Sequence, residues 1–218
     1  MPVPSPDAAL LSAMTTEHFV MQSAIGTAVA EQQARASMYL YSVSGALLAF
    51  GLMAESPHLL SIVFAVLPML FFVGVLTTLR LVDVSMESLQ SFVTVARVRE
   101  HYRTLGKPAA ILFDKAHGRW PEGKTDSGQI IGSVLGLLTT AASMICCVNA
   151  FVGGAGLALF LVNFVDSRLF VAVVVGTIFA LVQIVGFYRY QKWRIELVAK
   201  FAESAALKAG DEGETDHS

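Results

Sequence analysis

The pattern of hydrophobic and polar positions changes at Arg80. Residues 59–79 are 21 consecutive positions without a charge. As a helix rising about 1.5 Å per residue they would extend about 31 Å, which matches a hydrocarbon core of about 30 Å. Beyond Arg80, apolar residues recur three or four positions apart, and each is followed by a polar one: Val82, Met86, Leu89, Val93 and Ala96. This predicts one continuous helix that leaves the bilayer and becomes amphipathic.

A second charge-free block, residues 36–54, precedes this helix and is just long enough to cross a bilayer. The connection at residues 55–58 is short, so the spans at 36–54 and 59–79 are expected to form an antiparallel hairpin. The small residues between Ala24 and Ala36 favour packing of the preceding helix against residues 80–105. A solvated helical extension is the alternative.

The third block, residues 127–165, is 39 positions long and cannot hold two spans and a turn. We expect a span at about 129–151, a break or bend at the glycine cluster Gly153–Gly156, and a segment that stays at the far interface or dips partly back. A single long, tilted helix is the alternative. A fourth span is expected at about 169–187, followed by an aromatic and basic belt at residues 188–194.

The fold class predicted from these blocks is an all-α membrane protein. Four transmembrane helices form two antiparallel hairpins, and the helices extend into a short cytoplasmic bundle. The expected parts are a disordered tail (1–14), a first hairpin whose helix is capped near Thr15 and Thr16 (15–105), a loop (106–128), a second hairpin with a cytoplasmic helix (129–208) and an acidic disordered tail (209–218).

Composition and charge support a membrane location. The chain is 55% hydrophobic and 15% charged, whereas ordinary soluble domains carry about 25% charged residues. Fourteen of the fifteen Lys and Arg residues fall before the first span, between the hairpins or after the last span, and Arg168 is the exception. The positive-inside rule therefore predicts a multi-pass protein of the inner (plasma) membrane with both termini in the cytoplasm. Because the basic residues lie at membrane flanks, no nucleic-acid partner is expected.

Residues of three kinds are candidates for function. Those expected to pack helices or line a pore are Gly132, Gly136, Thr139, Thr140, Ser143 and Asn149. Those expected to act as hinges, or to serve packing alone, are Pro68, Gly153, Gly154 and Gly156. Those expected to contact lipid headgroups are Arg97, Arg99, Arg103 and Lys107.

The sequence offers little catalytic chemistry. The predicted spans hold no Asp, Glu, Lys, Arg or His, and the five histidines of the chain lack metal-ligand spacing. We interpret Cys146 and Cys147 as small buried residues. Residues 118–125 match the phosphate-binding pattern G-x-x-x-x-G-K-[ST], but no strand precedes them and Pro121 removes one backbone donor. We interpret this match as chance and expect no enzyme and no cofactor.

Two functions remain open on these grounds. One is an oligomeric pore-forming or membrane-perturbing protein, in which the lipid bilayer and further copies of the chain are the partners. The other is a non-conducting scaffold or accessory subunit that docks a cytoplasmic protein. Residues 1–35 lack the basic start and apolar core of a signal peptide, so none is expected.

The segment EQQARASMYLYSVSGALLA, residues 31–49, resembles a pattern of uncharacterised four-span integral membrane proteins of actinobacteria. That resemblance covers most of the chain. Residues 15–105, a polar helix leading into a two-span hairpin and back into a helix, are similar to the membrane effectors of bacterial cyclic-nucleotide antiphage systems. The second resemblance implies nucleotide-triggered membrane disruption, although those effectors often have only a two-span core. Neither resemblance assigns a functional residue here.

Overall fold

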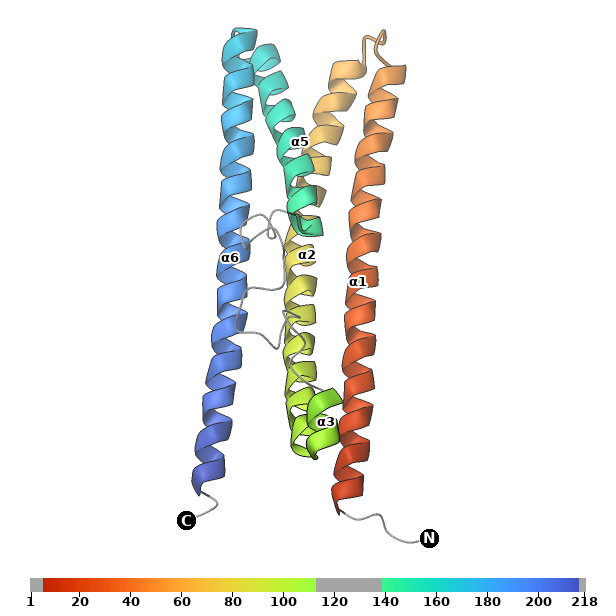
Figure 1. Cartoon of the computed structure of the whole chain (residues 1–218). Coiled ribbons are helices and arrows are strands. Elements are labelled where there is room, and N and C mark those ends of the chain that lie inside the picture. The colour runs from red at the N-terminus through yellow and green to blue at the C-terminus, as the bar shows by residue number, and fades with distance from the viewer. Residues whose placement is uncertain (1–5, 113–138, 216–218) are drawn as a thin grey trace. The chain divides into compact units, whose positions relative to one another are not determined.

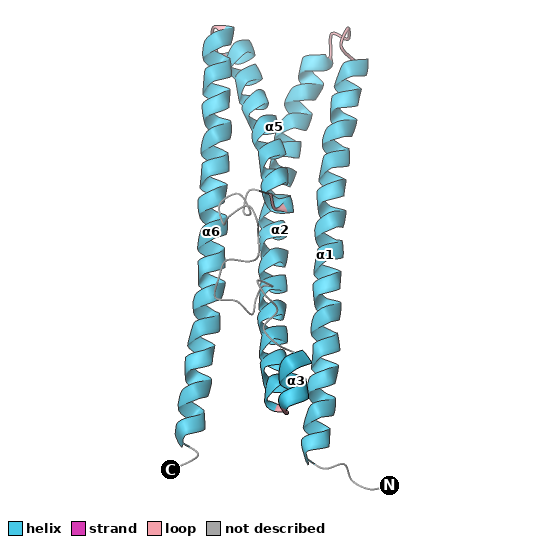
Figure 2. Ribbon diagram, in the orientation of Figure 1, coloured by secondary structure: helices cyan, strands magenta, loops and turns pink. Residues whose placement is uncertain are grey.

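The computed structural model describes residues 6–112 and 139–215 of the chain (Figure 1). Within these ranges the secondary structure is helical and contains no strand, which confirms the all-α class (Figure 2). The helices are α1 (Pro6–Leu52), α2 (Leu59–Thr104), α3 (Lys107–Leu112), α5 (Ala141–Phe164) and α6 (Leu169–Thr215). Residues 113–138, which include the G-x-x-x-x-G-K-[ST] match, Gly132 and Gly136, lie outside the described residues.

Three of the described helices are long and apolar enough to cross a membrane: α2, α5 and the Leu169–Val198 part of α6. These helices correspond to the predicted second, third and fourth spans. Helix α1 is not apolar enough over a comparable length. Its charge-free part ends with the helix at Leu52 and includes Ser37, Ser42 and Ser44.

Helix α5 differs from the predicted third span at both ends. Thr139 and Thr140 are not helical, and the helix begins at Ala141, where the Thr140 Oγ1 accepts a hydrogen bond from the Ser143 N–H. The prediction of a helical span over about 129–151 is therefore wrong at Thr139 and Thr140. The helix then continues through the glycine cluster to Phe164, so the helix does not break at Gly153–Gly156, in agreement with the alternative of one long helix. Contacts with neighbouring helices, described below, account for Gly153 and Gly154.

Two other predicted boundaries need correction. Helix α1 begins at Pro6 rather than after residue 14, since proline is well tolerated in a first helical turn. The Thr15 and Thr16 hydroxyls therefore lie within the helix and donate to the Leu11 and Ser12 carbonyls instead of capping it. Helix α6 continues to Thr215 into the predicted disordered tail, after an Ala-, Glu- and Lys-rich stretch at residues 199–208 that has high helix propensity.

The chain divides into two compact units. The apolar unit comprises residues 31–83 and 135–193, and the extension unit comprises the remainder. In the extension unit the Thr15 Oγ1 lies 3.5 Å from the Tyr102 hydroxyl, which places α1 beside α2. Of the small residues from 24 to 34, Ala28 is buried, whereas Ala24, Gly26, Ala30 and Ala34 are exposed. The predicted packing therefore involves one edge of that small-residue stretch.

Helix α5 packs against its neighbours in the apolar unit through glycines. A Cβ atom added to Gly154 would lie 2.7 Å from the Gly176 carbonyl oxygen of α6, and one added to Gly176 would collide with the Gly154 carbonyl oxygen. On another side of α5, a Cβ at Gly153 would lie 2.5 Å from the Phe71 ring of α2. The backbones of α5 and α6 can approach this closely only because neither position carries a side chain.

This contact predicts that Gly176→Ala lowers the free energy of unfolding by about 1–3 kcal/mol, the usual cost of overpacking. Gly186→Ala is a matched control in the same helix, because no atom lies within 4 Å of a Cβ at that position. Titration with a denaturing detergent, followed by circular dichroism, measures both variants. Equal stability of the two would contradict the proposed role of the glycine contact.

Candidate functional site

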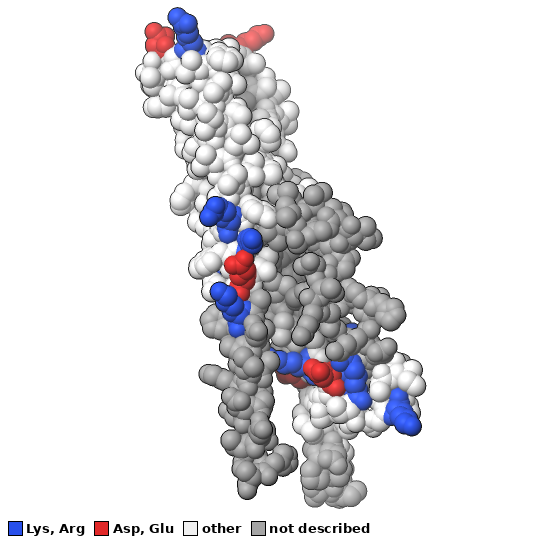
Figure 3. Space-filling model, turned by 60° about the vertical axis from the view of Figure 1, so that its left-hand side comes forward, with Lys and Arg blue, Asp and Glu red and all other residues white. Residues whose placement is uncertain are grey.

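Charged side chains in the apolar unit are confined to its ends. Glu55, Asp166 and Arg168 lie in the two helix connections, and the other charged residues are Glu31, Arg35, Arg80, Asp83, Arg189 and Lys192. Figure 3 shows one face on which an uncharged surface separates charged groups. The polar side chains between these ends are therefore the candidates for function.

The most deeply buried polar pair joins α1 to α5. The Tyr39 hydroxyl donates a hydrogen bond of 2.9 Å to the Asn149 Oδ1, and the residues are 2% and 0% exposed. Gly74 of α2 closes over the pair, since a Cβ there would lie 2.6 Å from the Tyr39 hydroxyl oxygen. The Asn149 Nδ2 has no hydrogen-bond partner among the described residues. Three helices therefore meet at one buried polar pair, in which the Asn149 oxygen has a hydrogen-bond partner and the Asn149 nitrogen does not.

A second polar cluster joins α6 to the start of α5. The Gln191 Nε2 donates to the Thr140 Oγ1 at 3.1 Å, and the Ser143 hydroxyl donates to the Gln191 Oε1 at 3.2 Å. Gln191 and Ser143 are both buried. The two helices are thus connected by side-chain hydrogen bonds that use both ends of one amide.

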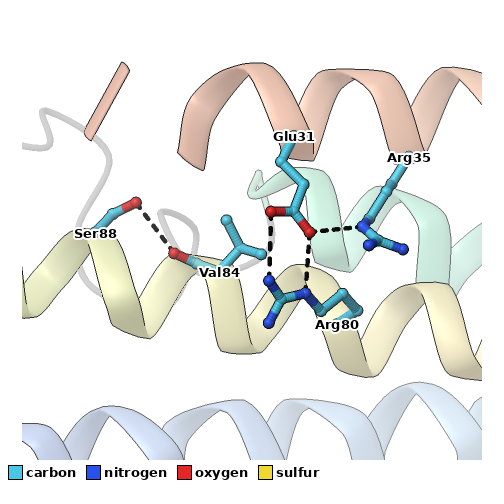
Figure 4. A network of polar contacts seen from close by, with 5 residues as sticks. All are labelled: Glu31, Arg35, Arg80, Val84 and Ser88. Carbon is cyan, nitrogen blue, oxygen red and sulfur yellow. Dashed lines mark hydrogen bonds and ion pairs between the residues drawn. The ribbon is translucent and has the colours of Figure 1, made fainter. Parts of the chain in front are cut away.

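An ion-pair network joins α1 to α2 near the charge-free stretches (Figure 4). The Glu31 Oε1 accepts hydrogen bonds from the Arg80 Nε at 3.0 Å and from the Arg35 Nε at 2.8 Å. The Glu31 Oε2 accepts a further bond from the Arg80 Nη2 at 3.3 Å, so Arg80 binds the carboxylate with two nitrogens. The hydrogen bonds from Arg80 and then Arg35 lower the pKa of Glu31 from its ordinary value of 4.5.

The structure brings some of the predicted site residues together. Thr140 and Ser143 share the Gln191 cluster, and Asn149 lies in the Tyr39 pair, positions that fit the helix-packing interpretation. Thr139 is exposed. Among the predicted hinges, Pro68 lies inside α2, and the glycines of α5 lie inside that helix. The predicted headgroup residues Arg97, Arg99, Arg103 and Lys107 lie on α2 and α3, outside the apolar unit.

Sequence reasoning missed several contributors to these contacts, among them Tyr39, Gln191 and Gly176. Tyr39 and Gln191 supply the partners of the polar residues on α5, and neither differs by its spacing from other residues of its segment. The role of Gly176 could have been predicted from the sequence. Gly176-x-x-x-Ala180 and Gly154-x-x-x-Ala158 both match the small-residue spacing of close helix pairs.

Cys146 and Cys147 are free thiols, as expected for adjacent cysteines, and Cys146 is buried. Within residues 6–112 and 139–215, no three His, Cys, Asp or Glu side chains gather as metal ligands.

The Tyr39–Asn149 pair predicts a specific loss of stability. Tyr39→Phe removes the donor and leaves both ends of the buried Asn149 amide without a partner, which costs about 1–3 kcal/mol. In an Asn149→Ala background the same change is expected to cost much less, because the stranded oxygen is gone. Tyr41→Phe, at a residue that is 75% exposed, is the control and should be neutral. Unfolding in mixed micelles measures the stability of all four variants. Additive effects of Tyr39→Phe and Asn149→Ala would contradict a stabilising hydrogen bond between the two side chains.

The Glu31 network predicts a pH dependence. Because its arginine partners hold the folded-state pKa of Glu31 below 4.5, ionised Glu31 stabilises the fold fully above pH 4.5. This contribution is lost as the pH falls from 4.5 through the lowered pKa. Glu31→Gln should therefore be less stable than the wild type at pH 7, and the difference should shrink below pH 4.5.

The control for this change is Glu55→Gln, in the connection between α1 and α2. Thermal unfolding from pH 7 to pH 3.5 measures both variants against the wild type. A difference for Glu31→Gln that stays constant across this range would mean that the ion pairs do not stabilise the fold.

Comparisons of the chain with protein-family models, with curated proteins and with solved structures find no match. The function proposed below rests on the residues and contacts of the chain itself.

Proposed function

We propose that the protein is a non-conducting membrane scaffold that holds a helical extension unit in the cytoplasm for a protein partner. The observation that carries the proposal is the arrangement of polar side chains in the apolar unit. Tyr39 and Asn149 bond to each other, and Gln191 bonds to Thr140 and Ser143, all within one chain. The polar atoms that form these bonds do not need further copies of the chain as partners, which supports a self-contained membrane anchor.

The proposed topology has four spans in two antiparallel hairpins, with α1 as the first span. Its charge-free part is short, and the Tyr39 bond to α5 supports its place in the same apolar unit as the other three. Fourteen of the fifteen basic residues then lie on one side, which supports a cytoplasmic location for both termini in the plasma membrane. The proposal includes no enzymatic activity and no cofactor.

The partner surface is assigned to the part of α1 that lies in the extension unit. Large apolar side chains remain exposed there: Leu10, Leu11, Phe19, Val20 and Val29. Polar residues such as Gln22 and Ser23 lie among them, so this stretch is unsuited to the hydrocarbon core. Exposed apolar side chains on a helix outside the bilayer can serve as contacts for a protein partner.

An oligomeric pore is the second candidate, and the outward face of α1 supports it. Tyr41, Ser44 and Gly45 are exposed although they lie within the charge-free stretch, and open space surrounds Gly45. In a bilayer such a face is suited to a second copy of the chain. The likeness of residues 15–105 to membrane effectors supports the same candidate.

Conductance and photocrosslinking separate the two functions. The scaffold is expected to give no unitary currents in planar bilayers. In cells, a photocrosslinking residue at Phe19 is expected to give one discrete protein adduct. The same residue at Met69 of α2 is a control of equal exposure, 69% against 68%, and is expected to contact only lipid. An impermeant thiol reagent should label His58→Cys, in the α1–α2 connection, from outside the cell.

The pore would be the supported function if two results were obtained together. The wild type would have to give stable currents that Gly45→Leu abolishes, and native mass spectrometry would have to show a closed oligomer. Equal protein adducts at Phe19 and Met69 would contradict the assigned partner surface. Labelling of His58→Cys only after permeabilisation would contradict α1 as a span.

A further inference from the structure

A groove lies on the apolar unit where α2, α5 and α6 meet. Its volume is about 390 Å³, within the range of about 300–1,000 Å³ typical of small-molecule sites. Its lining is mainly aliphatic and aromatic, with Thr78, Gln183 and Tyr190 as the polar contributors besides the Cys146 thiol. No charged side chain lines it. A ligand for this groove is therefore largely apolar and uncharged.

Gln183 is the polar group of this groove that lacks a partner. Its Oε1 is buried and accepts no hydrogen bond from the described residues. The Thr78 hydroxyl, by contrast, already donates to the Gly74 carbonyl at 2.7 Å. A buried amide oxygen without a donor is unfavourable. A ligand that donates a hydrogen bond to it is therefore expected to bind more tightly than a ligand that does not. A hydroxyl group can serve the amide in either orientation, because it both donates and accepts.

A second cavity lies next to the groove, along α2 and α5. Its volume is about 230 Å³, and it is lined by apolar residues including Leu67 and Pro68. Phe71 and Phe179 line both cavities, and their ring centroids are 5.9 Å apart. These two rings are in contact, so they form a wall that the cavities share. The groove itself has an apolar end at these rings and a polar end at Tyr190, which is next in sequence to Arg189. An acyl chain with a small polar terminus has this distribution of polarity.

We propose that this groove binds one uncharged glycerolipid with a free hydroxyl, of the diacylglycerol type. The hydroxyl donates to the Gln183 Oε1 near the charged end of the apolar unit. One acyl chain lies along the groove and reaches Phe71 and Phe179 at its apolar end. The absence of charge in both linings favours this lipid over anionic phospholipids, which are recognised through basic side chains.

A photoreactive diacylglycerol tests the proposal with the full chain in phosphatidylcholine nanodiscs. Unlabelled diacylglycerol should compete with the probe, whereas triacylglycerol, which lacks the hydroxyl, should not. Gln183→Leu should weaken binding of the probe roughly two- to tenfold, as expected for loss of one hydrogen bond. Gly186→Leu should weaken binding at least as much, because its side chain would enter the open space of the groove.

Gly51→Leu is the matched control, because Gly51 also has no atom within 4 Å of its Cβ and does not line either cavity. Circular dichroism confirms that each variant folds, and Gly186→Leu provides a test even if Gln183→Leu does not fold. Equal competition by triacylglycerol would show that the probe reports only ordinary contact with bulk lipid and would overturn the proposal. Unchanged labelling of Gly186→Leu would overturn it as well.

Discussion

The close approach of α5 to its neighbours is the constraint on which the apolar unit depends. Gly154 and Gly176 allow two backbones to meet, and Gly74 leaves room for the Tyr39–Asn149 pair against α2. In lipid, apolar surface gains little by moving from acyl chains to another helix, so packing and interhelical hydrogen bonds must stabilise the assembly. The glycines bring the backbones close enough for both. Asn149 and Ser143 would lose their partners on other helices if these contacts were lost.

The elements that depend on local pattern could be predicted from the sequence. The charge-free block at 59–79 and the amphipathic continuation beyond Arg80 appear together in α2, and the i, i+4 pair of Glu31 and Arg35 forms. Both follow from composition and helical periodicity within one segment, and neither requires knowledge of a distant partner.

The contacts of the candidate site depend on residues far apart in the chain, and here the pattern was insufficient. The glycine cluster of α5 has low helix propensity, which favours a break, yet contacts with α2 and α6 stabilise the helix through it. Likewise, Asn149 could be identified as a polar residue in an apolar block, but no local feature identifies Tyr39 as its partner. Local propensity was overruled at positions where another helix touches the backbone.

The Tyr39–Asn149 bond also bears on the order of events during synthesis. The two residues are 110 positions apart in the sequence, an interval of roughly 5–20 s at ordinary rates of translation. Throughout this interval α1 exists without α5, and the Tyr39 hydroxyl has to find water or a lipid headgroup in place of its final partner. The apolar unit therefore cannot mature helix by helix: its first helix acquires its buried bond only after the third apolar block has entered the membrane.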